Sequence, residues 1–310
     1  MFSLDIIIVN WNAGRQLWEC LESIVSANGE GFDLTRVVVV DNASTDGSIE
    51  GLENLGLPLT IIRNAENRGF GAACNQGSEG SQADYLLFLN PDIRLFPGSL
   101  WKPINFMQQP GHEHIGICGV SHVDEAGRMT TSCARFPTLK LMFGEMTGLY
   151  MLFPKVFPRH FLAENECNRS MEVDQIMGAF FLVRKSVFDS LNGFDERFFV
   201  YFEEVDFSLR AKQKGFTSYY LSDVSIFHKG GGTTEQVKLL RLFYSLRSKI
   251  LYGLKNFNFS QALSLIFFTF SIELIARILR SVIKLSLPSF YETIGAYIKL
   301  TIFFLRSVFK

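Results

Sequence analysis

Short apolar runs that alternate with helix-like segments are the feature of this sequence that most restricts its fold. The runs are rich in Val, Ile, Leu and Phe and are bounded by polar turns, which is typical of strands buried on both faces. We expect strands near residues 4–9, 36–41, 59–63, 84–90, 115–121 and 175–184, and helices near 14–27, 70–79 and 99–109. This alternation predicts an α/β fold with a mostly parallel central sheet and helices on both of its faces.

Three carboxylates stand close together in the run FFVYFEEVDFSLR at 198–210. Glu203, Glu204 and Asp206 lie there between apolar side chains. Like charges at this spacing raise one another's pKa, and burial raises it further, so one of the three can act as a general base near neutral pH. The alternative is a helix N-terminus, where each acid complements the macrodipole and contributes about 0.3–1 kcal/mol. The run alone leaves both interpretations open.

The polar run DNASTDGS, residues 41–48, directly follows a predicted strand. Open α/β sheets bind nucleotides at the carboxyl ends of their strands. Asp41 and Asp46 can accept hydrogen bonds from a base or from ribose hydroxyls, and Ser44 lets the chain turn. Taken by itself, the run is explained better as a turn in which Ser44 or Asp46 caps the next helix.

The run NRGFGAACNQG, residues 67–77, places small residues at the start of a predicted helix. Gly69 allows the backbone to approach a phosphate closely, and Arg68 adds a positive charge. The spacing of its glycines is that of neither a P-loop nor a dinucleotide fingerprint, so neither of those reactions is supported.

The strand-like run DYLLFLNPD at 84–92 ends in residues suited to a divalent cation. Asp92 would be a direct ligand, whereas Asn90 is neutral, so the metal would also need the substrate's diphosphate and another protein group. His228 follows a strand-like run and precedes glycines, although an isolated histidine of this kind is more often structural than a ligand.

The order of these motifs resembles family 2 glycosyltransferases of the GT-A fold, in particular bacterial rhamnosyltransferases and related enzymes of cell-surface polysaccharide synthesis. The resemblance covers roughly residues 1–235. It is carried by co-linear motifs: IIIVNWN (6–12), DNASTDGS (41–48), NRGFGAACNQG (67–77), FLNPD (88–92), VDQIMGAFFLVRK (173–185), NGFDERFFVYFEEVDFSLR (192–210) and HKGGG (228–232).

The resemblance implies a nucleotide-sugar site. Asn10 and Asp41 would line the nucleotide base, and Asp46 would lie near the ribose. Asn90 and Asp92 occupy the family's Asp-x-Asp position, where Asp92 would bind the Mg²⁺ or Mn²⁺ that bridges the donor's diphosphate.

The remaining motifs imply the groups that act on the acceptor. His228 matches a metal ligand of several relatives, and Glu204 matches the base that deprotonates the acceptor hydroxyl. Many relatives carry Asp at position 204, which leaves the base between Glu203 and Glu204, with Asp206 raising its pKa or binding the acceptor. In the run MGAFF, Gly178 and Ala179 either leave room for the sugar or acceptor or allow close packing of a central strand.

We therefore expect an inverting, metal-dependent glycosyltransferase that acts on a polyprenyl-diphosphate-linked saccharide. The resemblance favours dTDP-rhamnose as the donor and O-antigen or another surface polysaccharide as the product. The alternatives are a glucosyl-, galactosyl- or galactofuranosyltransferase that uses a UDP-sugar, and a non-catalytic subunit that binds a sugar nucleotide or a lipid.

The chain becomes basic toward its end. From residue 238 onward there are eleven Lys or Arg against two Glu, while the preceding part is acidic, which argues against nucleic acid as a partner. Charges recur three or four residues apart between 262 and 287, and seven apart beyond Pro288, so two amphipathic helices are expected, with a break at the proline.

This pattern divides the chain into a catalytic domain over 1–235 and a helical region over 236–310. We expect the helices to lie in the membrane surface at the cytoplasmic face of the inner membrane, as a peripheral anchor. The alternative is that they pack on the domain or on a partner subunit, and a homo-oligomer is allowed.

The N-terminal run, the five cysteines and the stretch 134–172 lead to three further expectations. The start MFSLDIIIVNWN has no basic n-region or cleavage site, so no signal peptide is expected. The five cysteines form no CxxC pair and are expected to be reduced thiols, and neither a zinc site nor a disulfide framework is expected. The stretch 134–172 has no firm period and is expected to be a mobile acceptor loop that also touches the membrane, or else an irregular buried segment.

Overall fold

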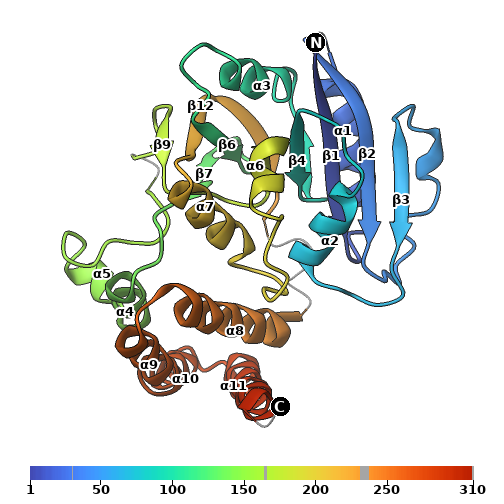
Figure 1. The fold of residues 1–310 in the computed structure, drawn as a ribbon. Helices are drawn as coiled ribbons and strands as arrows, with labels where there is room; N and C mark the ends of the chain where they lie inside the picture. Colours follow the sequence, from blue (N-terminus) through green and yellow to red (C-terminus); the bar gives the residue numbers. More distant parts are fainter. Residues whose placement is uncertain (30, 164–165, 231–236, 309–310) are drawn as a thin grey trace. The chain divides into compact units, whose positions relative to one another are not determined.

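The computed structural model describes residues 1–29, 31–163, 166–230 and 237–308 (Figure 1). They form two compact units, neither of which is continuous in sequence. The first unit comprises Met1–Phe136, Phe161–Glu196 and Glu203–Thr233, and the second comprises Pro137–His160, Arg197–Phe202 and Thr234–Lys310. Two short segments that the boundary at 235 assigns to the catalytic domain are thus grouped with the C-terminal helices.

A mixed, mostly parallel sheet forms the middle of the first unit. Its order is β3-β2-β1-β4-β11-β6-β12-β5, with β7 beside β6 and β9 beside β12, and β8 pairs with β10 in a separate small sheet. The strands are β1 (Phe2–Asn10), β2 (Phe32–Asp41), β3 (Leu59–Arg63), β4 (Tyr85–Leu89), β5 (Ile93–Leu95), β6 (Ile115–Val123), β7 (Met129–Thr130), β8 (Cys133–Ala134), β9 (Met171–Val173), β10 (Gln175–Ile176), β11 (Phe180–Arg184) and β12 (Thr217–His228).

Strand direction gathers the polar strand ends at one edge. The strands β1, β2, β3 and β4 run parallel to one another, and β12 runs parallel to β6. Because β11 is antiparallel to both β4 and β6, all of these others share one direction. Their carboxyl ends therefore lie along the same edge, while β11 begins there.

Helices cover both faces of this sheet. In the first unit they are α1 (Arg15–Ala27), α2 (Phe70–Ser78), α3 (Trp101–Met107), α6 (Lys185–Ser190), α7 (Glu203–Gln213) and a 3₁₀ turn at Leu52–Asn54. Along β1, Ile6 and Ile8 belong to the core cluster shared with α1 and α3, and Ile7 and Val9 to the cluster shared with α2, α6 and α7. This alternation buries the central strands on both sides, as their continuous apolar sequence predicts.

Close packing explains one of the small residues of α2. A Cβ added at Gly77 would lie 2.5 Å from Cγ2 of Ile7 and 3.0 Å from Cγ2 of Val40. The helix therefore rests directly on β1 and β2, and only glycine fits at this contact.

Two expectations about the middle of the chain are wrong. The single strand expected at 175–184 is divided into β10 and β11 by a turn at Gly178 and Ala179, and the two strands join different sheets. The stretch 134–172 contains two helices, α4 (Leu139–Thr147) and α5 (Leu149–Leu152), where no regular structure was expected.

The second unit is helical. Besides α4 and α5 it contains α8 (Lys238–Asn256), α9 (Phe259–Phe268), a π-helical turn (Thr269–Glu273), α10 (Leu274–Ile283) and α11 (Leu287–Val308). The chain breaks between α10 and α11, just before Pro288, as expected; the proline falls in the first turn of α11, where its missing N–H is not needed.

The predicted polar stripe of this region is partly internal. Glu273 is only 7% exposed and is paired with Lys249 of α8 and with Arg277, whose Nη2 lies 2.9 Å from Glu273 Oε1. A buried carboxylate between two cations replaces the solvent-facing charge expected from the spacing.

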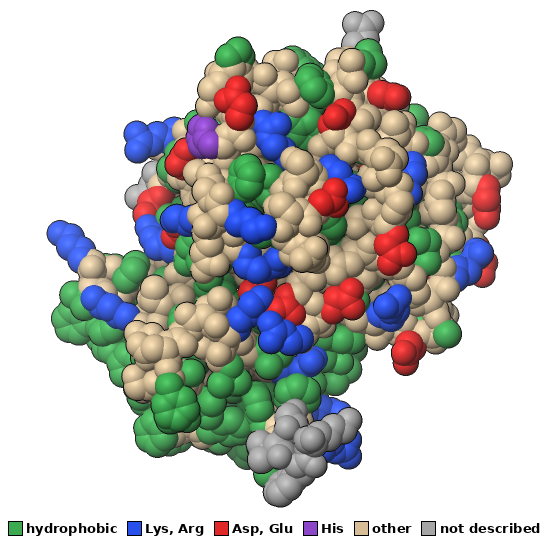
Figure 2. All heavy atoms as spheres, viewed as in Figure 1, with side chains coloured by type: hydrophobic (Ala, Val, Ile, Leu, Met, Phe, Trp, Pro, Cys, Tyr) green, Lys and Arg blue, Asp and Glu red, His purple; other side chains and the backbone are tan. Residues whose placement is uncertain are grey.

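Large apolar side chains remain exposed on the second unit, and Figure 2 shows them gathered over the C-terminal helices. They include Leu152, Phe153, Phe259, Phe267, Ile275, Leu279, Val282, Ile283, Leu285, Leu287 and Tyr291. Within the part of the chain that the structure describes, the helical run Phe259–Ile283 is long and apolar enough to cross a membrane by length and composition, with a mean hydropathy of 1.9. Core helices of soluble proteins can meet the same criteria.

Candidate active site

The ends of β1 and β2 are tied together by the amide of Asn10. Its Nδ2 lies 2.8 Å from Asp41 Oδ1, 3.0 Å from Ser44 Oγ and 2.8 Å from Ser48 Oγ. Asn10 is 0% exposed, so in this conformation it shapes the loop after β2 and offers no surface to a ligand. Asp41 is also buried and accepts a second bond from the backbone N–H of Ser44, at 3.2 Å.

Asp46, in contrast, is an exposed residue of the same loop. Its Oδ2 accepts from the N–H of Gly14 at 2.8 Å and its Oδ1 from the N–H of Ser48 at 3.0 Å. Partial burial alone would raise the pKa of Asp46, but the hydrogen bonds from Ser48 and Gly14 outweigh it and lower the pKa. The carboxylate is thus ionised and held in place.

The start of α2 adjoins this loop. Gly69 has a left-handed φ of 88° and its carbonyl accepts from Asn42 Nδ2 at 3.1 Å, which fixes the helix start beside the end of β2. Arg68 is exposed. The structure therefore places Arg68 and Gly69 near Asp41 in the fold.

Asn90 and Asp92 follow β4, the neighbour of β1. The N–H of Asn90 donates to the carbonyl of Ala179 at 3.0 Å, which joins the end of β4 to the turn before β11. Asp92 Oδ1 lies 3.6 Å from His228 Nε2, and the side chains are 9% and 12% exposed. Burial lowers the pKa of His228, an effect that the charge of Asp92 opposes, so the imidazole is neutral near pH 7 and has a free lone pair.

This pair fits a divalent cation that is completed by other ligands. Two neighbouring ligands of an octahedral ion at about 2.1 Å lie about 3 Å apart, so small side-chain shifts from 3.6 Å suffice. Among the described residues, no group of three or more His, Cys, Asp or Glu could hold a metal. Asp92 and His228 would therefore need the donor's diphosphate and water as further ligands.

A second histidine lies behind His228. His122 of β6 is 0% exposed and its ring packs edge-on against that of His228 at a centroid distance of 5.0 Å. Burial and, second, the nearby His228 lower the pKa of His122 strongly, so this ring is neutral. Sequence reasoning missed His122, because its contact with His228 joins strands about a hundred residues apart.

The carboxylates of the run at 198–210 lie in the first turn of α7, so the macrodipole interpretation is correct as far as their location goes. Their environments differ. Asp206 is 0% exposed and is bound by Arg210 Nε at 2.7 Å, and Arg210 also donates to the carbonyls of Leu191 at 2.7 Å and Gly193 at 2.9 Å. Asp206 thus holds α7 to the preceding loop.

Asn75 of α2, which the motif analysis did not single out, anchors the same loop. Its Nδ2 donates to the carbonyl of Phe194 at 2.9 Å, and its Oδ1 accepts from the N–H of Phe194 at 2.8 Å. These paired bonds reproduce those between two strands and fix the approach to α7. The available signal was the polar pair Asn75 and Gln76 within a helix of mostly small residues.

Glu204 faces the turn between β10 and β11. A Cβ added at Gly178 would lie 3.7 Å from Cβ and Cγ of Glu204, so the carboxylate stands against this glycine. Burial raises the pKa of Glu204 to about 7. Its Oε2 is buried and makes no hydrogen bond with the described residues.

Glu203 points elsewhere. It is 5% exposed, and burial followed by the charge of Glu204 raises its pKa well above the usual range. Its charge also contributes, after burial, to the raised pKa of the Cys74 thiol in α2, which places Glu203 toward that helix. A pKa of about 7 suits Glu204 to removing a proton near neutral pH.

The two residues directly before α7 have a strained backbone. Tyr201 and Phe202, immediately before α7, have positive φ of 68° and 71°. Such conformations are rare for aromatic residues and concentrate at functional sites.

The structure thus brings most of the predicted site residues to one edge of the sheet. Asn90 bonds to Ala179, whose neighbour Gly178 meets Glu204, and Asp92 meets His228. The end of β1 lies beside that of β4, since Ile8 pairs with Leu89. A carboxylate with a pKa near 7, a possible metal-binding pair and a nucleotide-type loop together suit the transfer of a group from a diphosphate to a hydroxyl.

Comparisons with known proteins agree with this geometry. Residues 5–191 match the sequence profile described as Glycosyl transferase family 2. The chain is 25% identical over 247 residues to the N-acetylglucosaminyl-diphospho-decaprenol L-rhamnosyltransferase of Mycobacterium tuberculosis, covering 74% of this chain and 77% of that protein. It is 29% identical over 146 residues to the rhamnosyltransferase WbbL of Escherichia coli, covering 47% and 52%.

Solved structures share the fold. The mannosyltransferase PcManGT from Pyrobaculum calidifontis, in complex with GDP-Man and Mn²⁺, aligns with a TM-score of 0.57 at 14% identity, covering 96% of this chain and 86% of that one. TarS residues 1–349 from S. aureus, in complex with UDP-GlcNAc, align with a TM-score of 0.53 at 15% identity, covering 95% and 79%. At these identities the likeness shows the fold alone, which is GT-A-like.

Proposed function

Since the chain belongs to glycosyl transferase family 2, we propose that this glycosyltransferase moves rhamnose from dTDP-rhamnose to a polyprenyl-diphosphate-linked saccharide, with inversion at the anomeric carbon. The observation that carries the reaction class is the position of Glu204, whose carboxylate has a pKa of about 7 and stands against Gly178, beside the strand end that bears Asn90 and Asp92.

Glu204 acts as the general base. Its free Oε2 accepts the proton of the acceptor hydroxyl, whose oxygen attacks the anomeric carbon from the face opposite the leaving diphosphate. A single displacement of this kind inverts the configuration. Proton removal by a positioned carboxylate accounts for roughly 10²–10⁴-fold in rate.

The nucleotide part of the donor is assigned to the loops after β1 and β2. Asp46 is ionised and exposed, which suits hydrogen bonds from ribose hydroxyls. Asn10 holds Asp41 and Ser44 of this loop in place by hydrogen bonds. Arg68 and Gly69, at the adjoining start of α2, are assigned to the diphosphate.

A divalent ion, Mg²⁺ or Mn²⁺, is assigned to Asp92 and His228, whose facing ligand atoms fit one. When bound, it neutralises negative charge that develops on the departing diphosphate. Asn90, as an uncharged neighbour, would support the sugar or the diphosphate by hydrogen bonds.

The choice of sugar and acceptor rests on the two rhamnosyltransferases in the comparison, one of which carries a decaprenol-linked acceptor in its name. A UDP-sugar donor is the second candidate, because the similarly folded TarS was solved with UDP-GlcNAc. Thymine and uracil differ by one methyl group.

We also propose that the second unit holds the enzyme at the cytoplasmic face of the inner membrane. Exposed apolar side chains on α9 to α11 and the excess of Lys and Arg beyond residue 238 support this assignment. A lipid-linked acceptor would then be met at the surface where its diphosphate lies.

Calorimetric binding of dTDP-rhamnose, UDP-glucose, UDP-galactose and GDP-mannose, with Mn²⁺ or with EDTA, tests the donor. Metal-dependent binding of dTDP-rhamnose alone is the expected result, and a preference for a UDP-sugar would overturn the assignment of the sugar but keep the reaction class.

Transfer to a short-chain polyprenyl-diphosphate saccharide by the wild type, and not by Glu204→Gln, then separates an enzyme from a binding subunit. Equal transfer by both would refute the assignment of the base.

A further inference from the structure

Two of the five cysteines lie side by side. Cys133, in β8, and Cys167 are separated by 34 positions in sequence, yet their Sγ atoms are 3.0 Å apart in the interior. Cys133 is 0% and Cys167 is 3% exposed. The other thiols have different neighbours: that of Cys20 donates to the carbonyl of Asn90.

The pair lies where the chain leaves the first unit and returns to it. We call the two adjoining segments, residues 133–136 and 161–162, the neck. The chain leaves the first unit after Phe136 and returns to it at Phe161, and the 24 residues between them belong to the second unit. Main-chain bonds hold the outgoing and returning segments together, because Ala134 forms a bridge with Phe161 and the N–H of Leu162 donates to the carbonyl of Cys133 at 3.2 Å.

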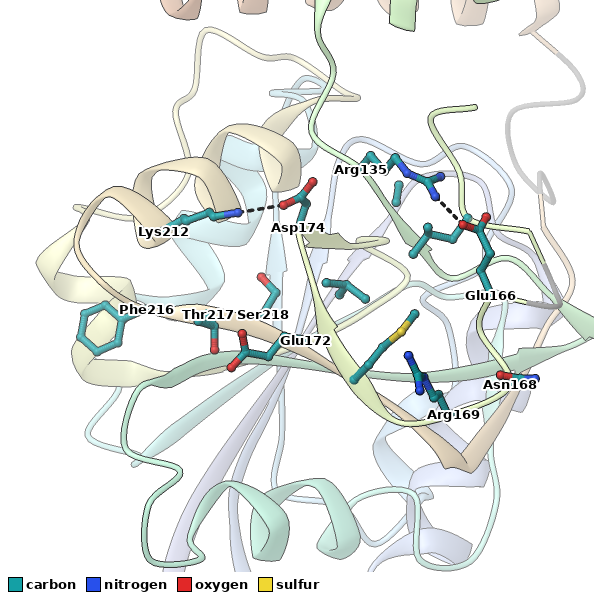
Figure 3. Close-up of a pocket in the computed structure, with 14 residues that line it drawn as sticks. Arg135, Glu166, Asn168, Arg169, Glu172, Asp174, Lys212, Phe216, Thr217 and Ser218 are labelled. Atoms are coloured by element: carbon teal, nitrogen blue, oxygen red, sulfur yellow. Dashed lines mark hydrogen bonds and ion pairs between the residues drawn. The ribbon is translucent and has the colours of Figure 1, made fainter. Parts of the chain in front are cut away.

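An ion pair joins the same two segments. Arg135 and Glu166 meet through Nη2 and Oε1, next to the two cysteines in sequence. Figure 3 shows this pair at the rim of a cavity of about 820 Å³, which Asn168 and Arg169 also line. Cys167 itself is buried, but its sequence neighbours Glu166 and Asn168 both line the cavity.

We propose that Cys133 and Cys167 are a redox-active dithiol, a modification site for a hydroperoxide, and that their oxidation to a disulfide closes the neck of the 137–160 segment. Thiols already held in contact by main-chain bonds and an ion pair need little rearrangement to form the bond. This inference does not depend on the proposed donor or acceptor.

The hydrogen bond between the thiols assigns their roles. Either sulfur can donate this bond; when Cys133 donates, the bond stabilises the Cys167 thiolate and lowers the pKa of Cys167, so we take Cys167 as the nucleophile. The Cys167 thiolate attacks one oxygen of hydrogen peroxide, giving a sulfenic acid, and the other oxygen leaves as water after taking up the thiol's proton. The Cys133 sulfur then displaces the hydroxyl group as a second water, and the disulfide forms.

Closing the neck has a specific consequence for the chain. The disulfide makes 137–160 a covalent loop, so both of its connections to the first unit are fixed at one point. In the cytosol such a bond is transient and is typical of redox sensing, which reconciles it with the reduced thiols expected from the sequence.

Peptide mapping tests the bond directly. Oxidation with equimolar hydrogen peroxide, alkylation and tryptic digestion should give peptide 129–135 linked to peptide 160–169, about 2 Da lighter than the sum of the two. Titratable thiols in the unfolded protein should fall from the five of the sequence to three and return with dithiothreitol.

Matched variants locate the change. Cys167→Ser should keep four thiols with or without peroxide, and Cys133→Ser should form no linked peptide and stop at a sulfenic acid on Cys167, which dimedone labels. Cys118→Ser, which removes a buried thiol elsewhere, should still lose two. Five remaining thiols in the wild type, or a sulfinic acid on Cys167 beside an intact Cys133 thiol, would overturn the proposal.

A second readout needs no thiol chemistry. Lys155 is exposed within the loop, so limited trypsin can cut the chain there. After oxidation the two fragments should migrate together on a denaturing gel without reductant and separate with it. Fragments that separate without reductant would show that the neck is not closed.

Discussion

Glu203 and Glu204 are adjacent in sequence but do different things, because a helix turns successive side chains by about 100°. Glu204 meets Gly178 at the sheet edge, and Glu203 turns toward Cys74 in α2. Burial raises the pKa of both: that of Glu204 to about 7 and that of Glu203, which the charge of Glu204 also raises, well above its usual range. Their orientation therefore supports Glu204 over Glu203 as the base of the proposed reaction.

Exchange of each glutamate for glutamine separates their roles. Glu204→Gln removes the base and should lower kcat by roughly 10²–10⁴-fold, with donor affinity unchanged. Burial and the charge of Glu204 favour the protonated form of Glu203, which glutamine imitates, so Glu203→Gln should keep kcat within a few-fold. The measurement is steady-state transfer with both substrates varied. A larger loss in Glu203→Gln would reverse the assignment.

The pKa of Glu204 also fixes a pH dependence. Below pH 7 the carboxyl is protonated and cannot act as a base, so kcat/KM should rise with pH and level off above about 7. Stability should run the other way: the folded state holds this proton more tightly than the unfolded chain does, so the free energy of unfolding falls as pH rises from 4.5 to about 7. Glu204→Gln should show neither dependence at this site.

Metal binding by Asp92 and His228 can be tested with a charge-removing variant. Asp92→Asn keeps the shape of the side chain but removes its charge, and should weaken Mn²⁺ binding in the presence of nucleoside diphosphate at least tenfold. The corresponding control is Asp124→Asn, a surface carboxylate paired with Arg128. Calorimetry in EDTA-treated protein measures both, and equal affinity of the two variants would place the ion elsewhere.

Among the elements, α7 carries Glu204, the proposed base, and its position depends on a buried ion pair. Asp206→Ala would leave the guanidinium of Arg210 without its buried partner, and should lower the free energy of unfolding by roughly 3–5 kcal/mol. Urea unfolding measures this. Asp189→Ala, which breaks the exposed pair with Lys185, should cost about 0–1 kcal/mol.

How far the sequence predicts the elements depends on how local their causes are. The strands β1, β2, β3, β4 and β6 are predictable because their apolar runs are continuous and end in turn residues. The division between β10 and β11 is not, because Ile176 and Phe180 are both apolar and only the pairing of β10 with β8 separates them. The helices α4 and α5 pack on other helices of their unit, as Phe143 does on Phe268, and so lack a clear period of their own.

The same distinction applies to the site. Asp46, Asp92, Glu204 and His228 stand at strand or helix ends, which motifs mark in the sequence. The role of Asn75 depends on a neighbour that is distant in the chain, and only its polarity within α2 marks it locally. His122 and the contact of Cys133 with Cys167 also depend on distant neighbours, and nothing local marks them.

For the whole molecule, membrane attachment is the testable property. Leu279→Glu with Ile283→Glu places two charges on exposed positions of α10 and should reduce sedimentation with anionic vesicles several-fold, since each residue loses its burial in lipid. Exposed positions on the first unit, such as Val25→Glu, should have no effect. If carbonate washing fails to release the wild type, the run Phe259–Ile283 spans the bilayer instead.

Neither unit is a single stretch of chain, and this limits how such a protein can be altered by cutting or joining genes. Truncation after residue 235 would leave 137–160 and 197–202 in place without the helices of their own unit. A new C-terminal region could not be exchanged by fusion at one point, because three separate segments would have to be replaced in step. Any exchange of the tail would therefore have to include two internal segments of the chain, the second of which ends directly before Glu203.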